Sequence, residues 1–463
     1  MTKDMTEGRP LRLIISFAFP MFLGMLFQQF YSMVDTIIVG KFLGVGSLAG
    51  VGSTGSLNFM VIGFCSGVCN GFAVPVAQMF GAKREEELRR CVANCAWLCI
   101  GFSAVLTAAV VALCRPILTL LNTPEDIFEY AYTYIVIIFC GIPFTFLYNI
   151  LAGIIRSLGD SRTPVVFLAL SSCINIALDI AFILVFHMGV AGPALATVIS
   201  QGVSGLICLW YMKKKYTILR MSRDEWRPRT GYMYRLCYIG IPMGLQYSVT
   251  AIGSLILQAA INGLGSLAVA GVTAGSRINM FFSCPVESLG ATMAPYSGQN
   301  TGAGRIDRVE EGVKAASLCG FALSAVMFGL AVLFGKRLAL IFLDTADAQV
   351  VAYAYQLLVT TTAGYCLLTL VNVVRFSIQG MGFSVFAIIS GVLEMVARGL
   401  AGLVLVPLFG FTGICFASVL AWVFADSFLI PAFLHCRNKL LRMHGIDPRA
   451  AKQRQRGVSS CMN

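Results

Sequence analysis

Residues 13–39 read LIISFAFPMFLGMLFQQFYSMVDTIIV, an apolar run that contains a single acid, Asp35. A helix needs roughly 20 apolar residues to cross a bilayer, so this run predicts a transmembrane helix. Comparable runs recur as far as residue 435, and the 463-residue chain is 57% hydrophobic and only 12% charged. Because soluble proteins are about 25% charged, we expect an all-α polytopic membrane protein with about 12 transmembrane helices. The expected spans are 13–39, 51–79, 92–113, 130–156, 164–186, 190–212, 235–261, 273–300, 313–335, 350–379, 384–406 and 411–435.

The net charge of +12 is distributed unevenly along the chain. With the N-terminus on the cytoplasmic side, 28 of the 34 Lys and Arg residues fall on that side, including Arg156 and Arg375. Five fall on the other side, and Arg398 lies inside a span. Since Lys and Arg favour cytoplasmic loops, we expect both termini in the cytoplasm. We further expect a multi-pass protein of the bacterial inner membrane, without a cleaved signal peptide and without a nucleic-acid partner.

The two halves of the chain repeat each other on either side of a polar stretch, 213–230. Pro20 and Pro242 are 222 residues apart, and Gln-x-x-Gly-Ala recurs at 78–82 and 299–303, an offset of 221. Six spans per half is an even number, so both halves enter the membrane in the same sense, related by an axis along the membrane normal. We expect two pseudo-symmetric six-helix lobes with substrate bound between them. The expected boundaries are an N-lobe at 1–212, a cytoplasmic linker at 213–234, a C-lobe at 235–435 and a basic cytoplasmic tail at 436–463.

Acids inside predicted spans are candidates for function, because a carboxylate at mid-bilayer costs roughly 2.5–3.5 kcal/mol on insertion scales. Asn175 and Asp179 are four residues apart and supply oxygen ligands that suit a hard cation, while Asp179 is equally able to carry a proton. The alternative for these acids is a role in helix packing. Asp35 shares one helical face with Pro20, Gly24, Gln28 and Tyr31.

The second half carries a different set of intramembrane charges. Glu394 and Arg398 are four residues apart, so they form either a structural ion pair or part of a cavity wall. Glu287 and Asp426 have no partner at helical spacing. With five acids and one Arg expected inside spans, the cavity should attract cations and repel anions. Walls rich in Phe and Met would accommodate varied amphiphilic cations.

Several motifs together resemble the multidrug and toxic compound extrusion (MATE) family over roughly residues 10–435. The motifs are MVDTIIVGKFLG at 33–44, the repeated Gln-x-x-Gly-Ala, RSLGDSRTP at 156–164, NIALD at 175–179 and GVAGPALAT at 189–197. The resemblance implies a two-lobed antiporter, coupled to Na⁺ or H⁺, that exports amphiphilic organic cations and other drugs. We expect no cofactor, no catalytic residue and no metal beyond Na⁺. We also expect a monomer in contact with membrane lipids and its small-molecule substrates.

The resemblance also assigns residues to sites. A first-lobe cation site is implied at Asp35, Asn175, Asp179 and Thr197. A bend of the first helix is implied at Pro20. Some members of the family carry acids in the seventh and tenth helices, but 244–257 and 364–374 have none here, so no second-lobe cation site of that type is expected. The candidate residues of the substrate cavity, from the resemblance and from the intramembrane charges, are Gln28, Tyr31, Asn149, Glu287, Glu394 and Arg398.

Other classes of protein differ from this chain in their characteristic residues and motifs. A lipid-linked oligosaccharide flippase of the same superfamily is the nearest alternative, and its anionic lipid would call for cationic side chains in the cavity, where one intraspan Arg is expected. A major-facilitator carrier shares the six-plus-six plan, but GAKREEELRR at 81–90 lacks its characteristic spacing. Neither H-E-x-x-H nor G-x-x-x-x-G-K-[ST] occurs, so we do not expect an enzyme or ATP-driven transport. The sequence does not separate Na⁺ from H⁺ coupling.

Overall fold

The computed structural model describes residues 3–121, 123–341 and 348–447, and this part of the chain is almost entirely helical, without a strand. The first half comprises α1 (Pro10–Ser53), α2 (Gly55–Gly81), α3 (Glu85–Leu120), α4 (Glu125–Cys140), α5 (Ile142–Ser157), α6 (Arg162–Ile180), the π-helical turn η1 (Ala181–Val185) and α7 (Ala191–Lys215). After the short η2 (Thr217–Leu219), the second half comprises α8 (Thr230–Asn262), α9 (Ser266–Gly302), α10 (Ile306–Ile341), α11 (Ala348–Ala363), α12 (Tyr365–Gly380), α13 (Val385–Leu400), η3 (Ala401–Leu405), α14 (Val406–Phe409) and α15 (Phe411–Met443).

The expected spans all fall on these helices. Within the described residues, nine helical segments are long and apolar enough to cross a membrane, and two bent pairs raise the number to eleven. The pairs are α4 with α5, bent by 48°, and α11 with α12, bent by 51°. The remaining expected span, 273–300, lies in α9, which is outside this apolar set and carries Arg277 and Glu287. The all-α membrane fold is therefore confirmed, with α9 more polar than the prediction assumed.

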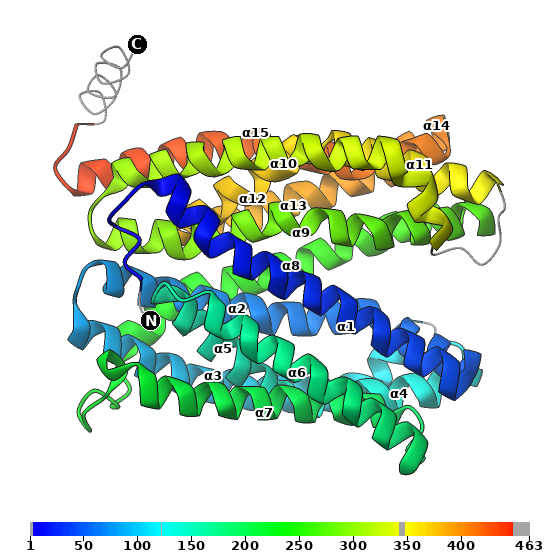
Figure 1. Cartoon of the computed structure of the whole chain (residues 1–463), viewed down its shortest axis with the longest axis horizontal. Helices are drawn as coiled ribbons and strands as arrows, with labels where there is room; N and C mark the ends of the chain where they lie inside the picture. Colours follow the sequence, from blue (N-terminus) through cyan, green and yellow to red (C-terminus); the bar gives the residue numbers. More distant parts are fainter. Residues whose placement is uncertain (1–2, 122, 342–347, 448–463) are drawn as a thin grey trace.

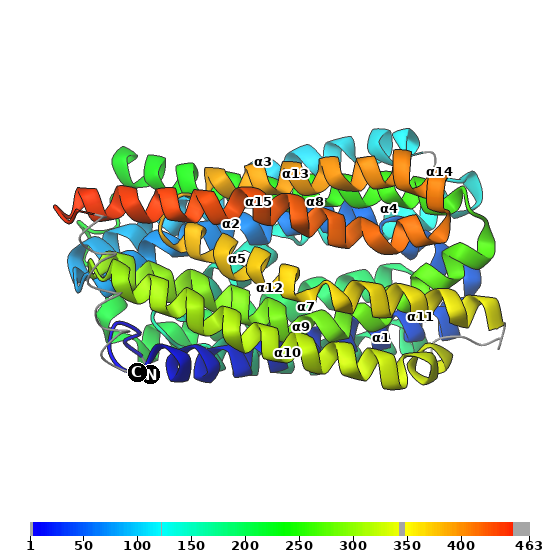
Figure 2. The same cartoon turned by 90° about the horizontal axis from the view of Figure 1, so that it is seen from above.

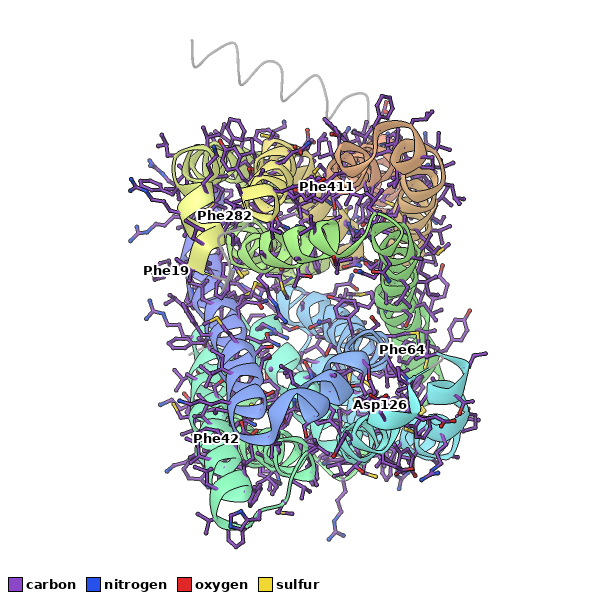
Figure 3. The ribbon with its side chains drawn as sticks, turned by 90° about the vertical axis from the view of Figure 1, so that its right-hand side faces the viewer. Phe19, Phe42, Phe64, Asp126, Phe282 and Phe411 are labelled. Atoms are coloured by element: carbon purple, nitrogen blue, oxygen red, sulfur yellow. The ribbon has the colours of Figure 1, made fainter. Side chains whose placement is uncertain are left out.

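The two halves lie side by side along the bundle. In Figure 1, α2 to α7 form the lower part and α9 to α15 the upper part, with α8 between them. Helix α1 runs diagonally from the second half to the first. Near its start, Phe17 belongs to one hydrophobic cluster with Met293 of α9, and near its end Gly50 packs against Tyr130 of α4. The view along the bundle places Phe42 and Asp126 on the first half and Phe282 and Phe411 on the second (Figure 3).

The described residues at both ends of the chain lie at the same end of the bundle, on the left in Figures 1 and 2. We call this end, which carries residues 3–9, the N-terminal end. The loops between α2 and α3, α5 and α6, α7 and α8, and α9 and α10 gather there. The N-terminal end therefore holds most of the basic loop residues that the sequence assigns to one side of the membrane.

The internal repeat is visible in the backbone as well as in the sequence. Gly44 and Gly265, 221 residues apart, adopt φ values of 85° and 91° with nearly equal ψ. Gly159 and Gly382 adopt φ values of 87° and 93°. Residues other than glycine rarely adopt such positive φ values. The equivalent turns of the two halves therefore both require glycine, which is why glycine recurs at the repeat offset. The π-helical turns η1 and η3 and the two bent helix pairs recur at equivalent places in the halves.

The connection between the halves is shorter than predicted and is folded against the first half. Helix α7 continues to Lys215 and α8 begins at Thr230, so only 216–229 connects them. Glu225 of this connection accepts a hydrogen bond from Arg89 of α3 at 2.7 Å. The backbone N–H of Ser222 and the Arg89 guanidinium lower the pKa of Glu225. Helix α15 likewise runs to Met443, beyond the expected boundary at 435, and the tail from 448 lies outside the described residues.

Candidate functional site

A polar cluster lies inside the first half where α1, α6 and α7 meet. Asp179 and Asn175 on α6 are 0% and 1% exposed, and the carboxyl groups of Asp179 and Asp35 are within hydrogen-bonding range of each other. With its amide oriented to suit both neighbours, Asn175 donates to Asp179 Oδ2 at 3.1 Å and accepts from the backbone N–H of Thr197 at 3.1 Å. The hydroxyl oxygens of Thr197 and Tyr31 are 3.4 Å apart. The four predicted cation-site residues are thus neighbours.

The arrangement of the two acids determines what the cluster can bind. Two carboxyl groups this close together, one of them fully buried and the other half-buried, are unfavourable as a doubly negative pair unless a cation lies beside them. The pair therefore requires a shared proton or a bound cation. Oδ1 of Asp35 and Oδ1 of Asp179 have no hydrogen-bond partner among the described residues. These oxygens, with the amide and hydroxyl oxygens around them, are the ligands that hard cations such as Na⁺ prefer.

Residues of α4 and α1 surround the polar cluster and determine how closely its helices pack. Tyr134 of α4, which sequence reasoning missed, lies within electrostatic range of Asp35 and Asp179. It is an aromatic residue in an apolar helix and gives no signal in the sequence. Helices α1 and α6 approach closely at Gly24, where a Cβ would lie 2.9 Å from a methyl group of Val165. The backbone of α1 stays helical at Pro20 and leaves helical values at Gly44, so the bend at Pro20 stays a prediction.

A separate cavity of about 710 Å³ lies between the two halves. Its walls come from α1, α2 and α5 on one side and from α8, α9, α12, α13 and α15 on the other. Four methionines from both halves give it an adaptable apolar lining: Met21, Met25, Met243 and Met280. We call it the central cavity.

Only three of the six residues predicted for the substrate cavity line the central cavity. Glu287, Glu394 and Arg398 line it. The resemblance implied a cavity within the first lobe for Gln28, Tyr31 and Asn149, and none of the three lines the central cavity. Tyr31 belongs to the first-half cluster, Asn149 donates to Thr145 O of its own helix at 2.8 Å, and Gln28 is exposed. Their role in a first-lobe cavity stays a prediction. The helical spacing that linked Gln28 to Asp35 identifies residues on one face, but it does not identify which neighbour covers that face.

Two arginines that the sequence assigned to cytoplasmic loops line the central cavity instead. Arg156 is the penultimate residue of α5, and Arg375 lies five residues before the end of α12, both toward the N-terminal end of the bundle. Arg375 donates to Glu394 at 2.7 Å, and Arg398 lies 3.6 Å from the same carboxylate. The prediction of a single Arg among the membrane-embedded charges was therefore wrong. The predicted pairing of Glu394 with Arg398 is present, but Arg375 is the closer partner of Glu394. Glu394 and Arg398 form an ion pair and also line the cavity wall, so the two alternatives given by the sequence apply together.

We expect Glu394→Gln to destabilise the protein by about 3–5 kcal/mol, because it leaves two buried guanidinium groups without their shared carboxylate. Glu394 is 3% exposed. Thermal unfolding of the purified protein in detergent measures the change. The matched control is Glu129→Gln, which removes an exposed partner of Arg115 and should cost less than about 1 kcal/mol. Equal unfolding temperatures for the two variants would contradict the structural role of the Arg375–Glu394 pair.

Repeated residues close the bundle at its N-terminal end. Gln78 of α2 donates to the carbonyl of Gly380 at 2.9 Å, and its repeat counterpart Gln299 donates to the carbonyl of Ser157 at 2.8 Å. Both bonds cross between the halves. A Cβ on Gly81 would lie 1.9 Å from the carbonyl oxygen of Gln299, and a Cβ on Gly302 would lie 1.9 Å from that of Gln78. We call this reciprocal contact of α2 and α9 the Gln–Gly closure. It follows directly after the parts of the two helices that line the central cavity, which include Ala77 and Pro295.

The segment before α1 reinforces this closure. Lys3 N–H donates to the carbonyl of Leu158 in the first half, and Met5 N–H donates to Gln299 Oε1 in the second, at 3.0 and 2.8 Å. Met5 is 0% exposed. Gly159 permits the close approach, since a Cβ there would lie 2.0 Å from Lys3 O. Residues 3–8 show no periodicity in the sequence that would have revealed this role.

Comparisons with known proteins agree with the architecture. The MatE family matches residues 20–181 and 242–401. The Probable multidrug resistance protein YpnP of Bacillus subtilis is 31% identical over 77% of this chain and 79% of its own length. The Multidrug export protein MepA of Staphylococcus saprophyticus is 24% identical over 88% of this chain and 90% of its own. The outward-facing structure of a multidrug resistance MATE family transporter of the MOP superfamily superposes with a TM-score of 0.87 at 22% identity, covering 96% of this chain and all of that one.

A bundle of membrane-crossing helices in two repeated halves, closed at one end below a central cavity, is the architecture of a membrane transporter. The chain belongs to the MatE family of multi-pass membrane transporters. The resemblance stated from the motifs is therefore confirmed.

Proposed function

We propose that this protein is a cation-coupled antiporter that exports amphiphilic organic cations from the cell by alternating access. The observation that carries the proposal is the contact between the carboxyl groups of Asp35 and Asp179 inside the first half, since such a pair must gain or lose a cation. The names of the curated relatives, multidrug resistance and multidrug export proteins, support a drug as cargo. Glu287, which faces the Met-rich central cavity without an ion-pair partner among the described residues, supplies a negative charge for a cationic drug.

Coupling follows if cation and drug favour opposite arrangements of the two halves, because a ligand shifts an equilibrium only through differential affinity. The cation site and the central cavity are separate, and α1 contributes to both: Asp35 to the first and Met21 and Met25 to the second. A change in how α1 packs against α6 would therefore alter both sites. The Gln–Gly closure would open in the opposite arrangement. We propose a monomer as the transporting unit, with no cofactor.

A transport assay with the purified protein in liposomes loaded with a fluorescent cationic dye identifies the coupling ion. A Na⁺ gradient alone and a pH gradient alone are imposed in turn. Dye movement under only one gradient identifies the coupling ion. The arginines of the central cavity favour one second candidate, the lipid-linked oligosaccharide flippase, because they are the groups that an anionic lipid requires. Flipping of a labelled polyprenyl lipid without dye movement under either gradient would replace drug export by that function.

We also propose that the N-terminal end faces the cytoplasm of a bacterial cell with the protein in its inner membrane. In a Cys-less background, Arg223→Cys in the exposed connection should react with an impermeant maleimide only after the cells are opened, because this end carries most of the Lys and Arg. His187→Cys, exposed at the opposite end, should react in intact cells. Labelling of residue 223 from outside intact cells would reverse the proposed topology.

A further inference from the structure

The central cavity carries one unneutralised positive charge on the first half, at Arg156. Among the described residues Arg156 has no acidic partner, and its only hydrogen bond is to Asn70 Oδ1, at 3.1 Å. It is surrounded by protein but remains accessible through the cavity that it lines. A guanidinium has five N–H donors, so one hydrogen bond leaves most of its donors to the cavity. A cation largely surrounded by protein is normally paired with an acid, and the missing acidic partner of Arg156 points to a ligand.

The other charges of the cavity do not neutralise Arg156. Glu394 is engaged by Arg375 and Arg398. Glu287 projects from α9 on the opposite half and forms no ion pair within the described residues. Tyr247 of α8 lines the same cavity as Arg156, Glu287 and Arg375. The central cavity therefore presents an available cation on one wall and an available acid on the other.

We propose that Arg156 binds an acidic group, a carboxylate or a phosphate, of the transported amphiphile. This proposal rests on the function proposed above and narrows its substrate class: the preferred cargo carries an anionic group for Arg156 as well as an amine for Glu287. Arginine suits this role because its planar fork binds both oxygens of a carboxylate at once. The methionines beside it accommodate the apolar body of the cargo. A purely cationic drug would fill the same cavity but leave Arg156 without a partner.

The test compares two forms of one xanthene dye, the zwitterion with a free carboxyl group and its methyl ester, which is a cation of nearly the same shape. Binding to the purified protein in lipid nanodiscs is measured by fluorescence anisotropy. A hydrogen-bonded charge pair predicts that the wild type binds the free acid roughly 10- to 100-fold more tightly than the ester. In Arg156→Gln this ratio should fall to about one, and Arg156→Lys should retain part of it.

The control is Arg162→Gln, an exposed residue on the same side of the bundle outside the cavity lining, which should keep the wild-type ratio. Measurement of both dyes on each variant separates a lost anchor from a misfolded protein, because misfolding weakens both dyes. No preference for the acid in the wild type, or an unchanged preference in Arg156→Gln, would overturn the proposal.

A third probe, a labelled polyprenyl diphosphate lipid, distinguishes a drug from a lipid as the source of the anionic group. Binding of this lipid that depends on Arg156, with no binding of either dye, would keep the anion anchor and refute drug export. Binding of none of the three probes to a well-folded protein would overturn the anchor itself.

Discussion

Asp35→Asn and Asp179→Asn should each reduce drug resistance to the level of cells without the protein. An amide cannot carry the exchanged proton, and it removes one of the two charges that would hold a metal cation. Truncating one member of a buried charged site costs about 2–5 kcal/mol, so affinity for the cation should fall roughly 30- to 4,000-fold. Growth in drug-containing medium measures resistance, and blotting of membranes measures insertion.

Stability distinguishes this functional role from a structural one. The carboxyl groups of Asp35 and Asp179 are in contact, so replacing one of them relieves repulsion, and the unfolding temperature should be unchanged or higher. Asp126→Asn, an exposed acid at the start of α4 (Figure 3), should leave both resistance and stability intact. Full resistance in both site variants would move the cation site away from the first half, toward Glu394 or Glu287.

The second large effect is expected at the Gln–Gly closure. Gly81→Ala or Gly302→Ala places a methyl group against backbone carbonyls that have no flexibility to yield. Overpacking of this kind costs about 1–3 kcal/mol, which would shift the equilibrium away from the closed arrangement by roughly 5- to 150-fold. Because both contacts join α2 to α9, the N-terminal end should open while each half keeps its own packing.

Spin labels at positions 83 and 307, which are exposed on the two halves beside the closure, would report the change as a longer mean distance by electron–electron resonance. The matched control is Gly329→Ala in α10, where a Cβ would meet no atom within 4 Å. This control should keep the wild-type distance, and alanine in a helix interior should stabilise it by about 0.5–1 kcal/mol. Identical distance distributions in Gly81→Ala and the wild type would show that the contact does not hold the closure.

The fold was predictable from the sequence because its determinants are local. Apolar runs longer than a bilayer require helices, and glycines at a constant offset mark turns that recur in both halves, as at Gly44 and Gly265. The neighbourhood of Asp35 and Asp179 was predictable only through the family resemblance. Asp35 and Asp179 lie far apart in the sequence and on two different helices, so the sequence pattern alone does not indicate that their side chains are close in space.

The charges of the central cavity were not predictable for a different reason. Arg156 and Arg375 lie near helix ends, where a hydropathy profile cannot distinguish a loop residue from one that faces inward. Only the packing of α5 and α12 against the other half turns these arginines toward the cavity. The segment 3–8 was missed because its contribution consists of single backbone hydrogen bonds to Leu158 and Gln299, which no sequence pattern encodes.

Equilibrium linkage between dye and cation tests the central claim of coupling through the first-half carboxyl pair most directly. Dye affinity is measured in nanodiscs at a series of Na⁺ concentrations and, separately, a series of pH values. Thermodynamic reciprocity requires that a cation favouring the opposite arrangement weakens the dye, and that the dye weakens the cation by the same factor. We predict a clear loss of dye affinity with one of the two cations in the wild type and no dependence on that cation in Asp35→Asn. The same dependence in the wild type and in Asp35→Asn would contradict the account.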